Sequence, residues 1–148
     1  MDGAFKPKTA ADVDKVVSAE IPTGEADRDL RGIVERCMSH GPCGILNPNC
    51  SCMFAGVCTK HFPKEFQDET MWNDKGYPRY RRREKVDGVA VKHSDGVRDN
   101  RWVVPYNREL LLTFRCHINV EVCTSIKAVK YLYKSIPIIP TFLGHFSA

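Results

Sequence analysis

The sequence lacks several patterns that would assign it to a familiar class of protein. It has no run of about 18 apolar residues, so no transmembrane helix is predicted. Residues 1–9 lack the apolar core of a secretion signal, so we expect no signal peptide. There is no GxxxxGK(S/T) phosphate loop, which excludes an ATPase site of that kind. No two histidines are separated by one residue, so a His-x-His metal pair is also absent.

What is present is ordinary for one globular domain. The 148 residues are 43% hydrophobic and 27% charged, which favours a folded core over wholesale disorder. The net charge of +4 comes from 22 basic and 18 acidic residues, a mild excess that does not by itself indicate nucleic acid. Seven cysteines without a secretion signal predict a reducing compartment, where clustered cysteines are more often metal ligands than disulfides.

Local patterns predict an α+β fold with a small antiparallel sheet and three main helices, at residues 11–20, 27–38 and 124–135. Thr9 and Asp12 have the spacing of a capping box before the first helix. Asp27 and Thr124 are the expected N-caps of the other two.

Shorter segments complete the predicted fold. Residues 109–115 are expected to form a short helix that turns three side chains inward, those of Leu110, Leu111 and Phe114. Asp87-Gly88 predicts a hairpin turn, and residues 102–104 predict a short strand. Apolar residues alternate with polar ones over residues 117–122, which is typical of a strand.

A cluster of cysteines and histidines occupies residues 40–61, where no helical or strand periodicity is convincing. Zinc in structural sites takes four Cys or His ligands in a tetrahedron. His40-x2-Cys43 is a good ligand pair and Cys52-x5-Cys58 a looser one, so we predict a closed structural site at His40, Cys43, Cys52 and Cys58. The reserve ligands are Cys50 and His61, followed by Cys37. The alternative is a set of free cysteines in a flexible loop.

A basic stretch at residues 77–85 is the candidate contact for nucleic acid. Cations neutralise phosphates, and aromatic rings stack on unpaired bases. The residues that we expect to contact DNA are Arg79, Tyr80, Arg81, Arg82, Arg83 and Lys85. The alternative is a solvated surface with its charges directed to water. His117 and Glu121 give a weaker hint of a metal site, for which the simpler interpretation is two polar residues on the outer face of a strand.

Ordered motifs over residues 11–134 together resemble one family, the replication-initiator region of Helitron transposases, known as the Helitron helicase-like domain. The motifs are His40-Gly41-Pro42-Cys43-Gly44, Cys52-Met53, Cys58-x-Lys60-x-Phe62-Pro63-Lys64, Gly76-Tyr77-Pro78-x-Tyr80-Arg81-Arg82-Arg83, Asp99-Asn100-Arg101, Val104-Pro105-Tyr106-Asn107, His117-Ile118-Asn119-Val120-Glu121 and Ala128-Val129-Lys130-Tyr131-Leu132-Tyr133-Lys134. The resemblance implies a role in a DNA-processing enzyme and supports the four ligands chosen from spacing.

The resemblance implies that the intact parent protein joins a two-histidine rolling-circle nuclease to an ATP-dependent helicase. Such a nuclease nicks single-stranded DNA with a tyrosine nucleophile, assisted by a divalent metal that polarises the phosphate. The divalent metal and ATP are therefore expected in the parent alone. Zinc is the one cofactor expected for this chain. The implied partner is single-stranded or duplex DNA in the nucleus, with no membrane partner.

This chain departs from the family pattern in ways that predict an inactive piece. The paired histidines of the family lie upstream of residues 12–22 and are not in this chain. Tyr131 matches the first of two tyrosines four residues apart, but Ser135 occupies the second position and Tyr133 is out of register. We therefore expect a fragment of the domain over residues 1–135, with Tyr131 as a nucleophile without its partners. Residues 136–148 are interpreted as a diverged tail.

Two alternatives remain open from the sequence. One is a stand-alone zinc-dependent module that binds nucleic acid. The other is a non-functional transposon remnant, in which lost strands leave sheet edges unpaired.

Overall fold

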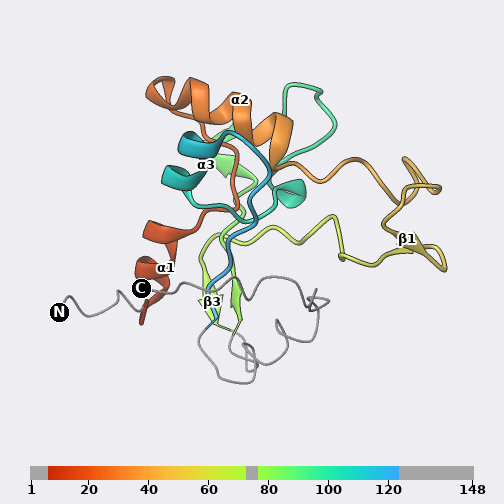
Figure 1. Ribbon diagram of the computed structural model, residues 1–148, viewed down its shortest axis with the longest axis horizontal. Helices are drawn as coiled ribbons and strands as arrows, with labels where there is room; N and C mark the ends of the chain where they lie inside the picture. The colour runs from red at the N-terminus through yellow and green to blue at the C-terminus, as the bar shows by residue number, and fades with distance from the viewer. Residues whose placement is uncertain (1–6, 73–76, 124–148) are drawn as a thin grey trace, which may run out of the picture.

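The computed structural model describes residues 7–72 and 77–123 (Figure 1). Its elements, in chain order, are α1 (Ala10–Val16), η1 (Glu25–Asp27), α2 (Arg28–Cys37), β1 (Met53–Phe54), β2 (Val57–Cys58), β3 (Met71–Trp72), β4 (Pro78–Arg79), β5 (Lys85–Val86), β6 (Val89–Ala90), η2 (Asn100–Trp102) and α3 (Arg108–Phe114). The predicted α+β class is confirmed. The predicted helix at residues 124–135, Tyr131 and the tail at residues 136–148 lie outside the described residues.

The first helix begins where its capping box predicts. The Thr9 side chain accepts a hydrogen bond from the Asp12 backbone N–H, and the Asp12 carboxylate accepts one from the Thr9 N–H. The helix ends at Val16, earlier than predicted, because the chain turns extended at Val17. Ser18 then exchanges two backbone hydrogen bonds with Tyr106, which attaches this segment to the core.

The second helix, α2, supplies most of the main hydrophobic core. Its buried side chains are Leu30, Ile33 and Val34, and Met38 follows at its C-cap. These residues pack against Val103, Tyr106 and Leu111, and α3 lies alongside α2 (Figure 1). Asp27 is the N-cap residue as predicted, but its side chain makes no capping hydrogen bond and pairs with Arg108 instead.

The described strands form three separate antiparallel pairs rather than one sheet: β1 with β2, β3 with β4, and β5 with β6. The predicted turn at Asp87-Gly88 is confirmed, since both residues have the positive φ that the tight connection of β5 to β6 requires. The short connections mean that each pair is a local hairpin, so the tertiary structure depends on the helices and on side-chain hydrogen bonds.

Two predicted features are wrong. Residues 102–104 do not form a strand, because Asn100–Trp102 is a 3-10 turn and Val103 makes a single bridge to Ser39. In α3 the side chain of Leu111 is buried, but those of Leu110 and Phe114 are 40% and 61% exposed. A helix of seven residues makes two turns, and here Leu111 is buried in the core and Leu112 packs partly buried against it.

Residues 117–122 show the predicted alternation without a strand ladder. Ile118, Val120 and Val122 are partly buried, while the polar residues between them are exposed. This extended segment is held by two hydrogen bonds, from the Val120 N–H to the Pro105 carbonyl and from the Val122 N–H to the Tyr80 hydroxyl.

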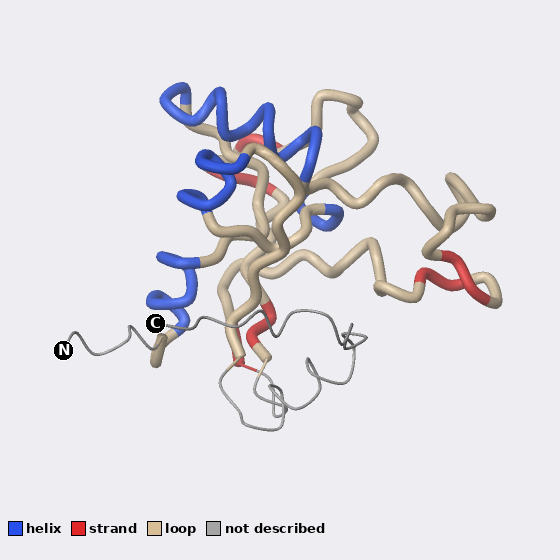
Figure 2. The backbone as a smooth tube through the Cα atoms, viewed as in Figure 1, coloured by secondary structure: helices blue, strands red, loops and turns tan. Residues whose placement is uncertain are grey.

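A lobe formed by residues 40–63 projects from the helical body, with the β1–β2 hairpin at its far end (Figure 2). We call it the Cys/His lobe. Residues 41–59 contain no Lys, Arg, Asp or Glu. Among the described residues, no helix is long and apolar enough to cross a membrane.

Candidate metal centre and the adjacent cleft

Four predicted ligands converge in the Cys/His lobe. The ligand atoms of His40, Cys43, Cys52 and Cys58 all lie within 4.8 Å of one another. The three sulfurs come from residues spread over the lobe, while His40 stands where the lobe leaves the helical body. One candidate centre therefore closes the lobe and joins it to the rest of the protein.

The β1–β2 hairpin places two of the cysteines. Met53 pairs with Cys58 and Phe54 with Val57, and the Thr59 N–H donates to the Cys52 carbonyl at 2.8 Å. The turn between the strands is Ala55-Gly56, with φ of 48° and 80°. Glycine adopts this left-handed conformation without a steric penalty, so the turn allows the short connection that brings Cys52 and Cys58 together.

The helical body fixes the position of His40. Its backbone N–H donates to the Trp102 carbonyl at 2.8 Å, and its ring stacks on Phe62 with centroids 4.3 Å apart. The Nε2 atom of His40 lies 3.6 Å from the Sγ atom of Cys58. Burial, and then the charges of Lys64 and Lys60, lower the pKa of His40. The imidazole is therefore held neutral, which is the form that binds metals.

The geometry of the four residues fits a tetrahedral ion. Zinc binds sulfur at about 2.3 Å and nitrogen at about 2.0 Å, which places the ligand atoms of a tetrahedron roughly 3.5–3.8 Å apart. The 3.6 Å separation of His40 Nε2 and Cys58 Sγ lies in this range. The other ligand atoms lie at most 4.8 Å apart, so small side-chain rotations would bring them to tetrahedral distances. Cys43 and Cys58 are buried together with Trp102, so solvent is largely excluded from one side.

The thiols are crowded in a way that a cation would relieve. Burial, together with hydrogen bonds among the neighbouring thiols, raises the pKa of Cys52 to about 12, and burial also raises the pKa of Cys43. For Cys58, burial is outweighed by hydrogen bonds from the Phe62 and Lys60 backbone, which lower the pKa, so of the three thiols this one ionises most readily. Three thiolates cannot coexist at such close range without a positive charge between them. A metal ion bound by these residues would supply that charge, because cysteine ligands bind metals as thiolates.

The three reserve ligands lie outside the group. His61 is exposed and lines the neighbouring cleft, and Cys50 is not among the four converging residues. Cys37, in the last turn of α2, contacts the carbonyl oxygen of Arg115 with its sulfur. The order of preference derived from spacing therefore agrees with the geometry. His117 and Glu121 form no such group either, and His117 instead contacts the Cys37 carbonyl at 2.8 Å through its Nδ1 atom.

Tyr80 and Arg82, two of the expected DNA contacts, have structural roles. Both side chains are buried, with exposures of 7% and 5%. The Nη1 atom of Arg82 donates to the carbonyls of Asn100 and Val103, each at 2.7 Å, and of Ala19 at 3.4 Å. The Tyr80 hydroxyl accepts from Val122. Tyr80 therefore cannot stack on a base, which corrects that expectation, and most of Arg82 belongs to the core.

The remaining basic side chains in residues 79–85 either form ion pairs or are exposed to solvent. Arg83 makes three hydrogen bonds to the buried carboxylate of Glu20, two from its side chain and one from its backbone N–H, and Arg81 also approaches Glu20. Arg79 pairs with Glu65 at 2.7 Å. Lys85 is exposed on β5. The stretch therefore does not form one continuous cationic surface, because alternate residues turn inward.

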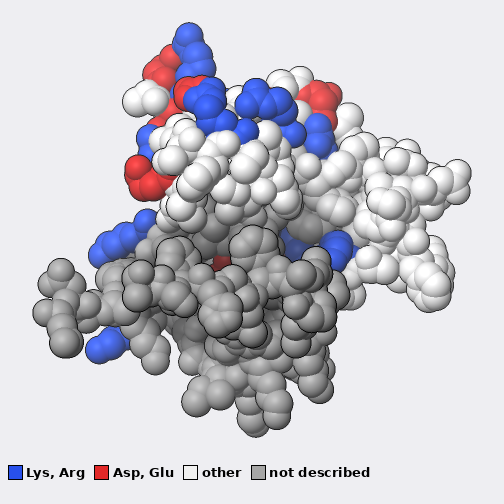
Figure 3. Space-filling view, in the orientation of Figure 1, with Lys and Arg blue, Asp and Glu red and all other residues white. Residues whose placement is uncertain are grey.

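A cleft of about 1000 Å³ separates the end of the Cys/His lobe from residues 117–121. The lysines and arginines that line it are Lys60, Lys64, Arg79 and Arg82, its histidines are His40, His61 and His117, and its acidic residues are Glu65 and Glu121. In space-filling view, Lys and Arg atoms occupy a hollow beside the uncharged lobe (Figure 3). With Glu65 paired to Arg79, the cleft carries a net positive charge.

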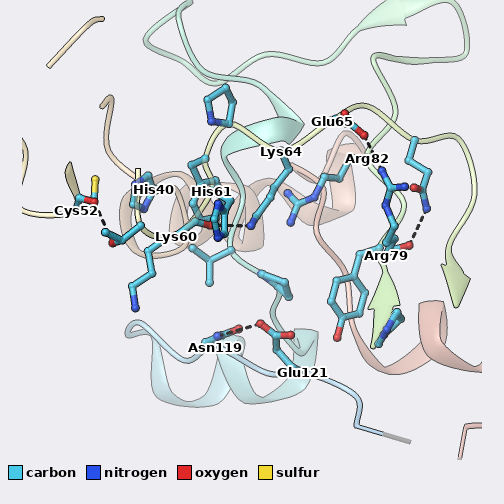
Figure 4. A pocket seen from close by; sticks show the side chains of 18 of the residues that line it. His40, Cys52, Lys60, His61, Lys64, Glu65, Arg79, Arg82, Asn119 and Glu121 are labelled. Atoms are coloured by element: carbon cyan, nitrogen blue, oxygen red, sulfur yellow. Dashed lines mark hydrogen bonds and ion pairs between the residues drawn. The ribbon is translucent and has the colours of Figure 1, made fainter. Parts of the chain in front are cut away.

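Sequence reasoning missed this cleft because its residues are far apart in the chain. Lys60 and Lys64 follow directly after the last cysteine ligand, so a fixed Cys58 would hold them near the centre. That spacing is the signal that could have found them. Glu121 approaches from the opposite wall (Figure 4), which only the tertiary structure reveals.

No model of a known protein family matches this sequence, and a comparison with curated proteins finds no significant match. The functional interpretation therefore depends on the site itself.

Proposed function

We propose that the chain binds one structural zinc ion through His40, Cys43, Cys52 and Cys58, and that the zinc-braced protein binds DNA. The observation that carries the proposal is the convergence of these four ligand atoms beside a cleft of net positive charge. Three thiolates and one imidazole are a ligand set that zinc prefers. Since four protein ligands leave no position for a reactive water, the zinc has a structural role and not a catalytic one.

We further propose that the chain is part of a Helitron-type rolling-circle transposase that acts in the nucleus. The support is the set of ordered motifs, several of which now have a structural role. The His40–Cys43 and Cys52–Cys58 motifs supply the four converging ligands. The motif at residues 80–83 supplies the buried Tyr80 and Arg82. Nicking of DNA is not part of the proposal for this chain, because Ser135 stands where the family has its second tyrosine and the sequence contains no two histidines separated by one residue.

The proposed function is tested by measuring zinc-dependent DNA binding of the full chain. Fluorescence anisotropy with a labelled single-stranded oligonucleotide should show an affinity that falls steadily as salt rises, since bound phosphates release counterions. Removal of zinc by a chelator should weaken binding, and added zinc should restore it. A zinc-loaded chain that binds no DNA, or binds it equally well at all salt concentrations, would contradict the proposal.

Two matched variants separate a zinc effect from a general cysteine effect. Cys52→Ser removes one of the four ligands, whereas Cys50→Ser removes a nearby thiol that is outside the group. The first variant should lose zinc and DNA binding together. The second should keep both.

A further inference from the structure

Two cationic side chains of the cleft, Lys64 and Arg82, form no ion pair with a carboxylate of the described residues. Lys64 is half-buried, and Arg82 is 5% exposed. Their hydrogen bonds go to carbonyl oxygens, from Lys64 Nζ to Lys60 at 2.7 Å and from Arg82 Nη1 to three backbone groups. No ion pair within the described part of the chain includes either residue.

The two charges act on the same region. Figure 4 shows the ammonium group of Lys64 and the guanidinium group of Arg82 directed toward the same part of the cleft. Burial, and then the charge of Arg82, lower the pKa of Lys64. Burial lowers the pKa of Arg82 to about 10, which leaves it charged at neutral pH. Two neighbouring cations that are partly removed from water repel one another, so an anion that contacts both is bound favourably.

Both groups have donors to offer such an anion. A lysine ammonium carries three N–H donors, and Lys64 uses one of them on Lys60. All three hydrogen bonds of the Arg82 side chain within the described residues use Nη1, so these residues provide no hydrogen-bonded acceptor for Nη2. A guanidinium and an ammonium together are the groups that proteins use to bind phosphate oxygens.

We propose that Lys64 and Arg82 hold a backbone phosphate of a single DNA strand lying in this cleft. The proposal rests on the DNA binding proposed above and names its site. A cleft of about 1000 Å³ is at the upper end of the range for small-molecule sites, so a lone phosphate would leave most of it empty. Lys60 and Arg79 also line the cleft and can follow adjacent phosphates. The cleft is too small to enclose a duplex.

Glu121 opposes this anion site and provides a second test of it. Whereas burial lowers the pKa of Lys64 and Arg82, the negative charge of Glu121 raises it, so Glu121 interacts electrostatically with both cations. A carboxylate on the opposite wall repels an entering phosphate. Neutralising it should therefore tighten DNA binding, an effect opposite in sign to the loss of Lys64.

The experiment measures binding of a labelled 12-nucleotide single strand, at several salt concentrations, to the full zinc-loaded chain. Lys64→Gln should weaken binding about tenfold, the size expected for one charge-assisted contact. The plot of log affinity against log salt concentration should become shallower by about 0.7. Glu121→Gln should tighten binding severalfold. The matched control is Lys92→Gln, which removes the same charge from an exposed position outside the cleft and should change affinity less than about twofold. Equal melting temperatures of the variants show that each is folded.

The possible failures are distinguishable. If the wild-type chain binds no DNA, both this inference and the proposed function are wrong. If the wild type binds but Lys64→Gln is unchanged, or resembles Lys92→Gln, the cleft is not the site and only this inference is overturned. A duplex that binds as tightly, with the same dependence on Lys64, would overturn the assignment to a single strand. Displacement of the strand by micromolar inorganic phosphate would indicate a small-anion site and would also overturn it.

Discussion

Arg82 joins three segments of the backbone from inside the protein. Its Nη1 atom donates to the carbonyls of Ala19, Asn100 and Val103, which belong to the segment after α1 and to η2 and its C-cap. The neighbouring Asn100 is fully buried, accepts from the Ile21 N–H at 2.7 Å, and donates to the Arg83 carbonyl at 2.8 Å. These two side chains replace the strand ladders that the short hairpins do not provide.

We predict that Arg82→Met lowers the free energy of unfolding by about 2–4 kcal/mol. The substitution keeps most of the apolar volume but leaves buried carbonyl oxygens without donors. Urea denaturation followed by circular dichroism measures the change. The control is Arg28→Met, because Arg28 pairs with Glu25 where both side chains are more than 80% exposed, and such pairs contribute less than about 1 kcal/mol. Equal stability losses in the two variants would contradict the role assigned to Arg82.

Glu20 makes the stability of the protein depend on pH. Burial raises the pKa of Glu20, but hydrogen bonds from the side chain and backbone of Arg83 outweigh burial, so its pKa in the folded state is lowered. A carboxylate with a lowered folded pKa stabilises the protein above its unfolded pKa of about 4.3. That contribution is lost as pH falls through the lower folded value.

Glu20→Gln should therefore be less stable than wild type at neutral pH, and the difference should shrink toward pH 3. Urea denaturation at intervals between pH 3 and pH 7 measures both curves. Glu25→Gln is the matched control at an exposed position, and its curve should run parallel to that of the wild type. A Glu20→Gln difference that stays constant or grows in acid would show that the carboxylate does not act in this way.

At the scale of elements, the β1–β2 turn determines whether the ligands meet. Gly56 has a φ of 80°, and no other atom lies within 4 Å of the position where a Cβ would be. A side chain there would not clash, but an L-residue in this left-handed conformation costs roughly 1–2 kcal/mol. We predict that Gly56→Val lowers zinc affinity about tenfold, measured by competition with a chromophoric chelator.

The control for this prediction is Gly32→Ala in α2. Gly32 is exposed in the helix with open space around it, so the added methyl group should raise stability by about 0.5–1 kcal/mol and leave zinc affinity unchanged. Equal zinc affinity in the Gly56 and Gly32 variants would show that the turn does not position the ligands.

Local signals predicted those elements whose cause is local. The capping box before α1 and the Asp87-Gly88 turn depend on neighbouring residues, and both are confirmed. The prediction of a strand at residues 102–104 was wrong. Hydrogen bonds between the Asn100 side chain and distant backbone groups favour the 3-10 turn, and sequence patterns do not reveal such bonds. In the basic stretch, the inward position of Arg82 likewise depends on the Ala19 carbonyl, and the ion pairs of Arg81 and Arg83 depend on Glu20, all about 60 residues away.

The four ligands were predicted from the sequence because ligand chemistry and spacing are local, whereas the cleft beside them was not. Lys64 and Glu121 come from segments that meet only after the lobe and the residues beyond α3 are in place. The basic stretch showed where the positive charge is in the sequence, but burial and ion pairs decide which of these charges remain available.

At the scale of the whole molecule, the Cys/His lobe differs from the helical body because its buried residues are mainly cysteines of the candidate metal centre. The buried residues of the third core cluster are Cys43 and Cys58 from the lobe and Trp102 from the body. Large apolar side chains of the lobe are exposed instead, among them Ile45, Leu46, Phe54 and Val57. A lobe that buries so little would be stabilised by the proposed zinc ion, as are small zinc domains that are unfolded without their metal.

Zinc-edge X-ray absorption of the purified full chain shows whether His40, Cys43, Cys52 and Cys58 hold a zinc ion. The proposed function predicts one zinc per chain with three sulfurs at about 2.3 Å and one nitrogen at about 2.0 Å. Cys50→Ser should leave this spectrum unchanged, while Cys52→Ser should abolish it. A shell of oxygen ligands, a shell with two sulfurs, or an equal loss of zinc in both variants would contradict the account.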